Sequence, residues 1–143
     1  MPAERVFVDT NVLIYAHDID AGAKRAIAGA TLLALWEQRQ GMLSTQVLQE
    51  FYVNVTRKIP SPLPRELARQ VVRTYAAWHV ELAGPALILR ASELEERYQL
   101  AFWDALIVAA ALEGGATRVL TENLNPGQLI QGLTIENPFR SAA

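Results

Sequence analysis

Carboxylates that could bind a hard metal ion recur at separated positions of this sequence. Asp9 directly follows the apolar run 6–8, Glu50 lies in a segment with helical periodicity, and Asp104 is the only charge between positions 100 and 112. Oxygen ligands without His or Cys suit Mg²⁺ or Mn²⁺. Such ions polarise a phosphate, lower the pKa of an attacking water and stabilise the leaving oxygen. The residue types therefore indicate metal-dependent phosphodiester cleavage, provided that the fold brings them together.

Asp9 and Glu50 also fit ordinary structural roles. Asp9 follows a strand and precedes a helix, so it could be a cap or turn residue. Glu50 lies on the shoulder of an apolar helical stripe, on the same side as Asn54, and could be a solvated helix residue. Position alone does not separate these roles from metal binding.

Asp104 is the most informative single residue. Its surroundings, Leu-Ala-Phe-Trp-Asp-Ala-Leu-Ile-Val at 100–108, predict a helix that is apolar all round and therefore buried. A buried carboxylate needs a cation, a hydrogen-bond donor or a proton. An arginine or backbone donors could meet that need, and so could a metal ion.

The corner Thr121-Glu122-Asn123 follows a strand-like run and could add a further polar group to the site, or be only a turn or helix cap. Arg65, Arg69 and Arg73 recur every four residues, which fits either a phosphate-tracking row or a solvated helix face. His17 and His79 could serve as a metal-free acid/base pair, but nothing in the sequence brings them together.

Periodicity and turn residues predict an alternation of strands and helices. Strands are expected at 5–9, 42–44, 79–82 and 117–121, with a last edge strand at 133–135. Helices are expected from 12 after a cap at Thr10 or Asn11, at 23–39, at 46–58 after a cap at Thr45, and at 64–78, 85–98 and 101–113. This alternation favours an α/β fold with a mostly parallel sheet covered by helices, in which ligands gather at the carboxyl ends of the strands.

The composition fits a single domain spanning residues 1–143 that can bury a core, with 51% hydrophobic residues and no cysteine. No secretory signal or membrane-length apolar run is evident, so a soluble, cytoplasmic protein is expected. The net charge of -2 disfavours binding to nucleic acid through a whole-surface positive field. Phosphates would have to be held by a local basic patch or by bound cations.

Four motifs resemble those of PIN-domain nucleases, and in the same order. Val-Phe-Val-Asp-Thr-Asn-Val-Leu-Ile-Tyr at 6–15 and Phe-Trp-Asp-Ala-Leu-Ile at 102–107 are specific, whereas Gln-Val-Leu-Gln-Glu-Phe at 46–51 is weak alone. Val-Leu-Thr-Glu-Asn-Leu at 119–124 resembles the fourth motif. The resemblance covers nearly the whole chain, and at this size it is strongest to VapC-like ribonuclease toxins of toxin–antitoxin pairs.

This resemblance implies a three-layer α/β/α fold with a central sheet of four or five strands. It implies an endoribonuclease that hydrolyses RNA with Mg²⁺ or Mn²⁺, in which Asp9, Glu50 and Asp104 are metal ligands, directly or through water. Asn123 would complete the site, and Thr10 would orient Asp9 or the scissile phosphate. A homodimer and a cognate protein antitoxin that blocks the cleft are also implied.

Asn123 departs from the family pattern, because many members carry Asp at this position. An amide oxygen brings no charge, so we expect one tightly held ion rather than two. Glu122 is adjacent but is expected to point elsewhere. The same departure supports a rival hypothesis, a PIN-like domain that has lost catalysis and binds RNA or protein.

Overall fold

A single sheet forms the centre of the molecule in the computed structural model, which describes residues 4–140. Its strands are β1 (Arg5–Val8), β2 (Gly41–Ser44), β3 (His79–Glu81), β4 (Ala116–Leu120), β5 (Leu129–Ile130) and β6 (Leu133–Glu136). Their order is β3-β2-β1-β4-β6-β5, and every neighbouring pair is parallel except β5 with β6. The carboxyl ends of β1, β2 and β4 therefore lie side by side.

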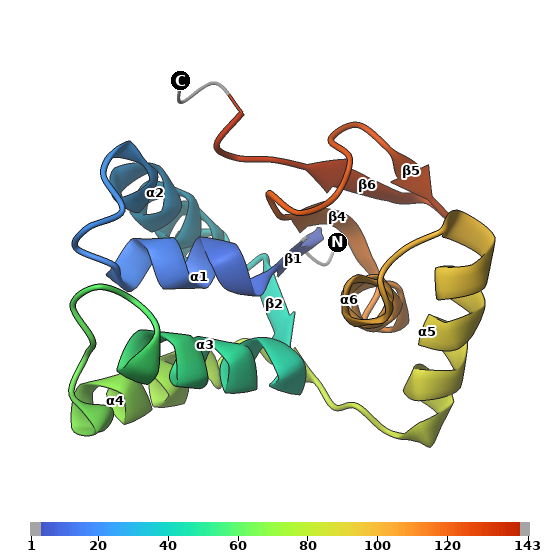
Figure 1. Cartoon of the computed structure of the whole chain (residues 1–143). Coiled ribbons are helices and arrows are strands. Elements are labelled where there is room, and N and C mark those ends of the chain that lie inside the picture. The colour runs from blue at the N-terminus through green and yellow to red at the C-terminus, as the bar shows by residue number, and fades with distance from the viewer. Residues whose placement is uncertain (1–3, 141–143) are drawn as a thin grey trace.

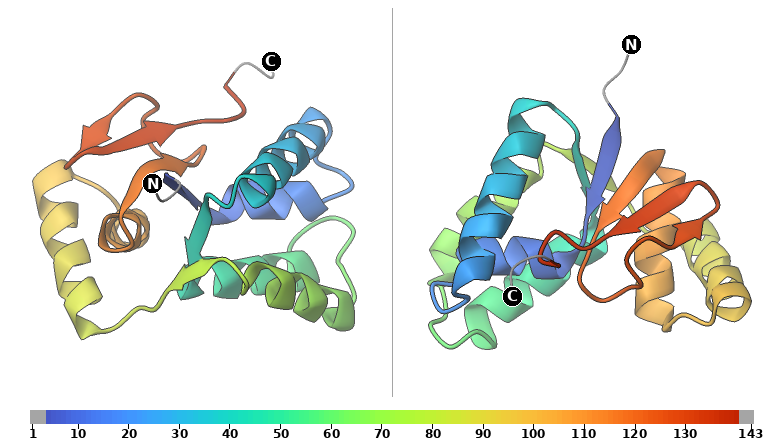
Figure 2. Two further views of the ribbon diagram at one scale, coloured as in Figure 1. Left: turned by 180° about the vertical axis from the view of Figure 1, so that it is seen from behind. Right: turned by 90° about the horizontal axis from the view of Figure 1, so that it is seen from above.

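The helices cover both faces of this sheet. They are α1 (Thr10–His17), α2 (Ala23–Glu37), α3 (Thr45–Arg57), α4 (Arg65–Tyr75), α5 (Pro85–Tyr98) and α6 (Phe102–Glu113). Helices α1 to α4 lie on one side and α5 and α6 on the other (Figures 1 and 2). Between residues 4 and 140, no helix combines the length and the apolar character needed to cross a bilayer.

Strand β1 lies inside the sheet, between β2 and β4, and its side chains are apolar on both faces. Val6, Phe7 and Val8 are fully buried, as expected for a parallel strand with helices above and below it. Phe7 is aligned with Met42 of β2 and Val119 of β4. The residue that follows β1 is thereby held between two neighbouring strand ends.

The predicted fold class is confirmed, and the sheet extends one strand further than expected. The structure has six strands rather than four or five. The segment 133–135, expected to be an edge strand, is β6, which lies between β4 and β5. The edge is formed instead by the two-residue β5, which runs antiparallel to β6. Leu129–Ile130 is too short to show a strand periodicity in the sequence.

Two helix caps differ from the prediction by one or two residues. Asp9 caps α1, where Thr10 or Asn11 was expected, and Ser44 caps α3, where Thr45 was expected. In each case the last residue of extended backbone accepts a hydrogen bond from a first-turn N–H group. Asp9 is therefore both a helix cap and a candidate site residue, so the two interpretations of this residue do not exclude each other.

Candidate active site

Asp9 lies at the centre of the candidate site, directly after β1. Its backbone N–H donates to the Leu120 carbonyl of β4 over 3.0 Å, which continues the sheet by one residue. Its Oδ1 accepts from the Thr10 N–H at 2.7 Å, and its Oδ2 accepts from the Thr121 hydroxyl at 2.7 Å. Only 4% of the residue is exposed. The carboxylate is thus fixed by the strand before it, the helix after it and the neighbouring strand end.

Burial raises the pKa of the Asp9 carboxyl to about 6, against the two hydrogen bonds that lower it. The negative charges of Glu50 and Asp104 raise it further. These two carboxylates are therefore near enough to act on Asp9, and none of the groups that shift its pKa is positively charged. An uncompensated negative cluster of this kind favours a bound cation.

Glu50 is tied to the Asp9 segment by a direct contact between helices. The Thr10 hydroxyl of α1 donates to Glu50 Oε1 of α3 over 3.0 Å. Glu50 is half-buried, so it is not the fully solvated residue that its helix shoulder allowed. Thr10, itself 7% exposed, links the two acidic positions.

Asp104 lies in the first turn of α6, at its exposed end. It is half-buried rather than buried, because full burial of the helix begins only at Ala105. Its neighbour Trp103 is 64% exposed. Desolvation still raises the pKa of Asp104. Within residues 4–140 its carboxylate has no ion pair or hydrogen bond, so the arginine or backbone donor considered as a partner is not found.

Thr121 joins the fourth candidate position to Asp9. It is fully buried, and its hydroxyl donates to Asp9 while accepting from the Asn123 N–H at 3.1 Å and from Asn11 Nδ2 at 3.3 Å. The Asn123 backbone is thus held near Asp9, and its side chain is exposed. The sequence marked this corner but did not reveal the role of Thr121. A polar residue directly after a central strand is the signal that points to it.

Glu122 points away from Asp9, as expected. Its carboxylate accepts a short hydrogen bond from the Tyr15 hydroxyl and forms an ion pair with Lys24 Nζ at 2.8 Å. Lys24 also lies over the Tyr15 ring, 4.8 Å from its centroid. Glu122 therefore holds the loop after β4 against α1 and α2.

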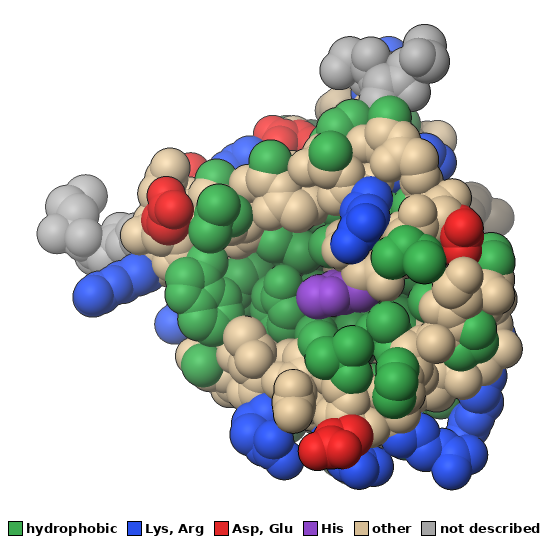
Figure 3. Space-filling view, turned by 90° about the vertical axis from the view of Figure 1, so that its left-hand side faces the viewer, with side chains coloured by type: hydrophobic (Ala, Val, Ile, Leu, Met, Phe, Trp, Pro, Cys, Tyr) green, Lys and Arg blue, Asp and Glu red, His purple; other side chains and the backbone are tan. Residues whose placement is uncertain are grey.

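The two histidines occupy separate places. His17 packs edge-on against Phe51 and Tyr75 and lines a largely apolar hollow of about 360 Å³ between α1, α2 and α4 (Figure 3). His79 begins β3, where its Nε2 lies 2.9 Å from Glu81. The structure does not bring them together as an acid/base pair.

The donor chemistry of the site fits Mg²⁺ or Mn²⁺, although the ligands are not fully assembled. Asp9 supplies a rigid buried carboxylate, and Glu50 and Asp104 supply two more nearby. In the part of the chain that the structure describes, no three His, Cys, Asp or Glu side chains converge into a ligand cluster. A small hard cation keeps several of its waters, so it does not need three direct protein ligands.

Thr121→Val should lower the free energy of unfolding by about 1–3 kcal/mol, because it removes a hydrogen-bond donor from the buried Asp9 carboxylate. Thr121→Ser retains the hydroxyl and should be nearer to the wild type. Urea unfolding at pH 7 in EDTA measures both. A valine variant as stable as the wild type would refute the role given to this hydroxyl.

Comparison with known proteins agrees with this architecture. The sequence model of the PIN domain matches residues 6–126. A search of curated proteins gave no match. Among solved structures, a toxin–antitoxin complex from Klebsiella pneumoniae is similar with a TM-score of 0.69 and 21% identity, over 93% of this chain and 97% of that one.

Two other solved structures are similar. DNA-bound VapBC from Salmonella typhimurium has a TM-score of 0.65 and 20% identity, over 95% of this chain and 99% of that one. VapC20 from Mycobacterium tuberculosis, a sarcin-ricin loop cleaving toxin, has a TM-score of 0.63 and 23% identity, over 80% and 86%. At these identities the likeness shows a shared fold. Because the family match spans most of the sequence, the chain belongs to the PIN domain family.

Proposed function

We propose that this protein is a divalent-metal-dependent endoribonuclease. The observation that carries the proposal is the buried carboxylate of Asp9, which accepts hydrogen bonds from Thr10 at the start of α1 and from Thr121 after β4. The charges that shift its pKa are those of two further carboxylates, and no cation is among them. Membership of the PIN domain family supports the same chemistry. The fold alone would not, since one fold hosts many functions.

Each proposed site residue has a distinct role. Asp9, Glu50 and Asp104 would hold Mg²⁺ or Mn²⁺, directly or through its waters, and Asn123 would complete the site with a neutral oxygen. A bound ion would lower the pKa of an attacking water and stabilise the leaving oxygen. Thr10 would fix the positions of Asp9 and Glu50 relative to each other, because its N–H donates to Asp9 and its hydroxyl donates to Glu50.

The proposed biological setting is a type II toxin–antitoxin pair. The similar structures include a toxin–antitoxin complex and a toxin that cleaves the sarcin-ricin loop. We therefore propose RNA as the substrate, a cognate protein antitoxin as an inhibitor, and a cytoplasmic homodimer. A short neighbouring reading frame for a DNA-binding antitoxin would support this setting.

RNA cleavage by the purified protein tests the enzyme proposal. Sarcin-ricin loop RNA and a mixed cellular RNA should be cleaved with Mg²⁺ or Mn²⁺, should resist cleavage in EDTA, and should be cleaved again when the metal is restored. A wild type that is inert with every divalent metal would refute it.

A binding module that has lost catalysis is the second candidate. It is favoured by Asn123, which brings no charge, and by the absence of a converged ligand cluster in residues 4–140. Binding of RNA or of a protein partner without any cleavage would support it. The two candidates are thus separated by the cleavage assay itself.

Asn123→Asp should tighten Mn²⁺ binding about tenfold or add a second ion, because charge count sets the affinity of such sites. Asn125→Asp adds the same charge in the same exposed loop and serves as the matched control. Calorimetric Mn²⁺ titration measures affinity and stoichiometry. Two equally tight ions in the wild type would contradict the role assigned to Asn123.

A further inference from the structure

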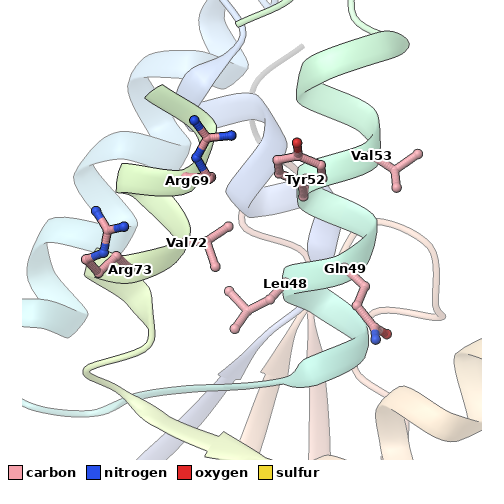
Figure 4. Close-up of a pocket in the computed structure, with 7 residues that line it drawn as sticks. All are labelled: Leu48, Gln49, Tyr52, Val53, Arg69, Val72 and Arg73. Carbon is pink, nitrogen blue, oxygen red and sulfur yellow. The ribbon is translucent and has the colours of Figure 1, made fainter. Parts of the chain in front are cut away.

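Two hollows outside the candidate site differ in the chemistry of their lining. A groove of about 610 Å³ lies between α3 and α4, where Leu48, Tyr52 and Val72 form a mostly apolar surface (Figure 4). A second hollow, of about 400 Å³, combines indole rings with guanidinium groups, and we call it the Trp–Arg pocket. Its volume is that of a small-molecule site. Its lining includes Arg5, Trp36, Arg39, Gly41, Trp78 and His79.

The Trp–Arg pocket lies at the amino ends of the strands, whereas the carboxylate site lies at their carboxyl ends. Arg5, Gly41 and His79 are the first residues of β1, β2 and β3. Because these strands are parallel, their first residues share one edge of the sheet, and Asp9 follows the opposite end of β1. In Figure 2, β1 leads away from that edge to α1. A ligand in this pocket would therefore not compete with an ion at Asp9.

Close packing at the start of β2 holds the indole rings of the pocket in place. A Cβ atom added to Gly41 would lie 2.5 Å from the Trp78 ring, so glycine is what lets this ring lie so close to the strand. Trp78 packs in turn against Trp36, with ring centroids 5.8 Å apart. Trp36 remains 41% exposed. The packing thus supports an indole ring with an open surface, on which another aromatic group can stack.

Two guanidinium groups give the pocket a positive charge. Within residues 4–140 neither Arg5 nor Arg39 forms an ion pair, and no carboxylate lines the pocket. The Arg5 side chain is fixed, because its Nη1 donates to the Gly114 carbonyl over 2.7 Å. A guanidinium has further N–H donors, which remain for an anion. The pocket therefore favours a ligand that carries a phosphate or carboxylate beside an aromatic ring.

Arg39 occupies a backbone position at which glycine is usual. It follows Gln38, the cap of α2, and its φ of 57° lies in the left-handed region. An L side chain is strained in this conformation, so glycine would make the helix end more stable. Strained positions of this kind cluster at binding and catalytic sites. The presence of an arginine here supports a role for its guanidinium in the pocket.

The lining discriminates between possible ligands. A bare phosphate would leave the indole surface unused, and an uncharged aromatic compound would leave both guanidinium groups without a partner. An RNA strand would need further cations along its path, whereas the pocket offers two arginines and the net charge of the chain is -2. A single nucleotide matches both the aromatic surface and the charge.

We propose that the Trp–Arg pocket binds a nucleoside monophosphate, whose base stacks on Trp36 and whose phosphate is held by Arg5 and Arg39. This site is separate from the proposed metal site and does not depend on its activity, since none of the proposed metal ligands lines it. Binding should therefore persist in EDTA.

Calorimetric titration in EDTA with AMP tests the proposal. AMP should bind at least about tenfold more tightly than adenosine, which lacks the phosphate, and than ribose 5-phosphate, which lacks the base. A 5′-phosphorylated adenylate trimer should bind no more tightly than AMP. Equal binding of AMP and either fragment would overturn the proposal. So would a lack of AMP binding, or a trimer that binds about tenfold more tightly than AMP, which would make an RNA strand the ligand.

Arg39→Gly separates ligand binding from stability. It removes a guanidinium and relieves the left-handed backbone, so it should weaken AMP binding about tenfold while the Tm stays equal or rises. Arg57→Gln is the matched control, because it removes the same charge at the exposed end of α3, outside the pocket. It should bind AMP like the wild type. An equal loss in both variants would reduce the effect to net charge and overturn the proposal.

Trp36→Leu tests the stacking surface. It should bring the affinity for AMP down to that for ribose 5-phosphate, because leucine retains an apolar side chain but offers no ring. Trp103→Leu changes an exposed indole on α6, outside the pocket, and should keep the wild-type preference. Thermal melting verifies that both variants are folded. A folded Trp36→Leu variant with the full preference for AMP would overturn the proposal.

Discussion

Asp9→Asn should reduce RNA cleavage more than about 100-fold, the upper cost for a residue that only supports a metal ligand. At the same time it should make the metal-free protein more stable at neutral pH. Both effects follow from one buried negative charge that has two acidic neighbours and no cation. Asparagine keeps an oxygen that accepts from the Thr10 N–H, but its amide nitrogen replaces the oxygen that accepts from the Thr121 hydroxyl, so the loss of this hydrogen bond offsets part of the gain.

The gain in stability has a defined dependence on pH. The folded pKa of Asp9 is about 6, above the value of about 3.9 for an unfolded chain. Between these values the folded state binds more protons, so the wild type loses stability as pH rises from about 4 to about 6. The loss amounts to about 3 kcal/mol above pH 6. Asp9→Asn should remove this dependence.

Urea unfolding in EDTA at a series of pH values measures the change in stability. Cleavage assays at pH 7 measure the loss of RNA cleavage. The two readouts should move in opposite directions, which a mutation that merely disrupts the fold cannot produce. If Asp9→Asn were less stable than the wild type at pH 7 and its free energy of unfolding kept the same pH dependence, the charge of Asp9 would not be uncompensated in the folded protein.

Asp104→Asn is the second variant with a large expected effect. It should also lower cleavage by more than about 100-fold, because it removes one of three carboxylates that would hold the ion. The stability of the fold should change little, since the carboxylate is half-buried and forms no ion pair within residues 4–140. Single-turnover cleavage in Mg²⁺ and in Mn²⁺ measures the loss.

Glu113→Gln is the matched control on the same helix. It removes the same charge at the other end of α6, where Glu113 pairs with Arg90 at an exposed surface. This control should cleave RNA like the wild type. Full activity in Asp104→Asn would exclude this residue from the metal site and leave Asp9 and Glu50 as its only candidate carboxylates.

The order of elements was predictable from the sequence because each has its own periodicity. The runs 6–8 and 85–98 were identified as a strand and a helix, and both are confirmed. The position of β6 inside the sheet was not predictable, because it depends on the two-residue β5 that pairs beyond it. The exact helix caps were also missed, since several polar residues compete at each helix start.

The candidate site was only partly predictable. The acidic positions stood out by their placement, and the structure links Asp9 to Glu50 through Thr10, while the charges of Glu50 and Asp104 both raise the pKa of Asp9. The prediction that Asp104 is buried was wrong, because an apolar run does not reveal whether the first turn of a helix is exposed to solvent. The role of Thr121 depends on the adjacency of β1 and β4, which no local pattern specifies.

The folding unit is larger than the stretch of sequence similarity. The PIN domain match ends at residue 126, whereas β6 pairs with β4 beyond it, and the Thr121 N–H donates to the Glu136 carbonyl over 2.9 Å. The buried Phe139 packs edge-on against Tyr15 with ring centroids 5.2 Å apart. A fragment cut at the end of the match would turn β4, the strand that leads to Thr121, into an open sheet edge prone to aggregation. The described residues after position 126 thus belong to the scaffold of the candidate site, although the PIN domain match does not reach them.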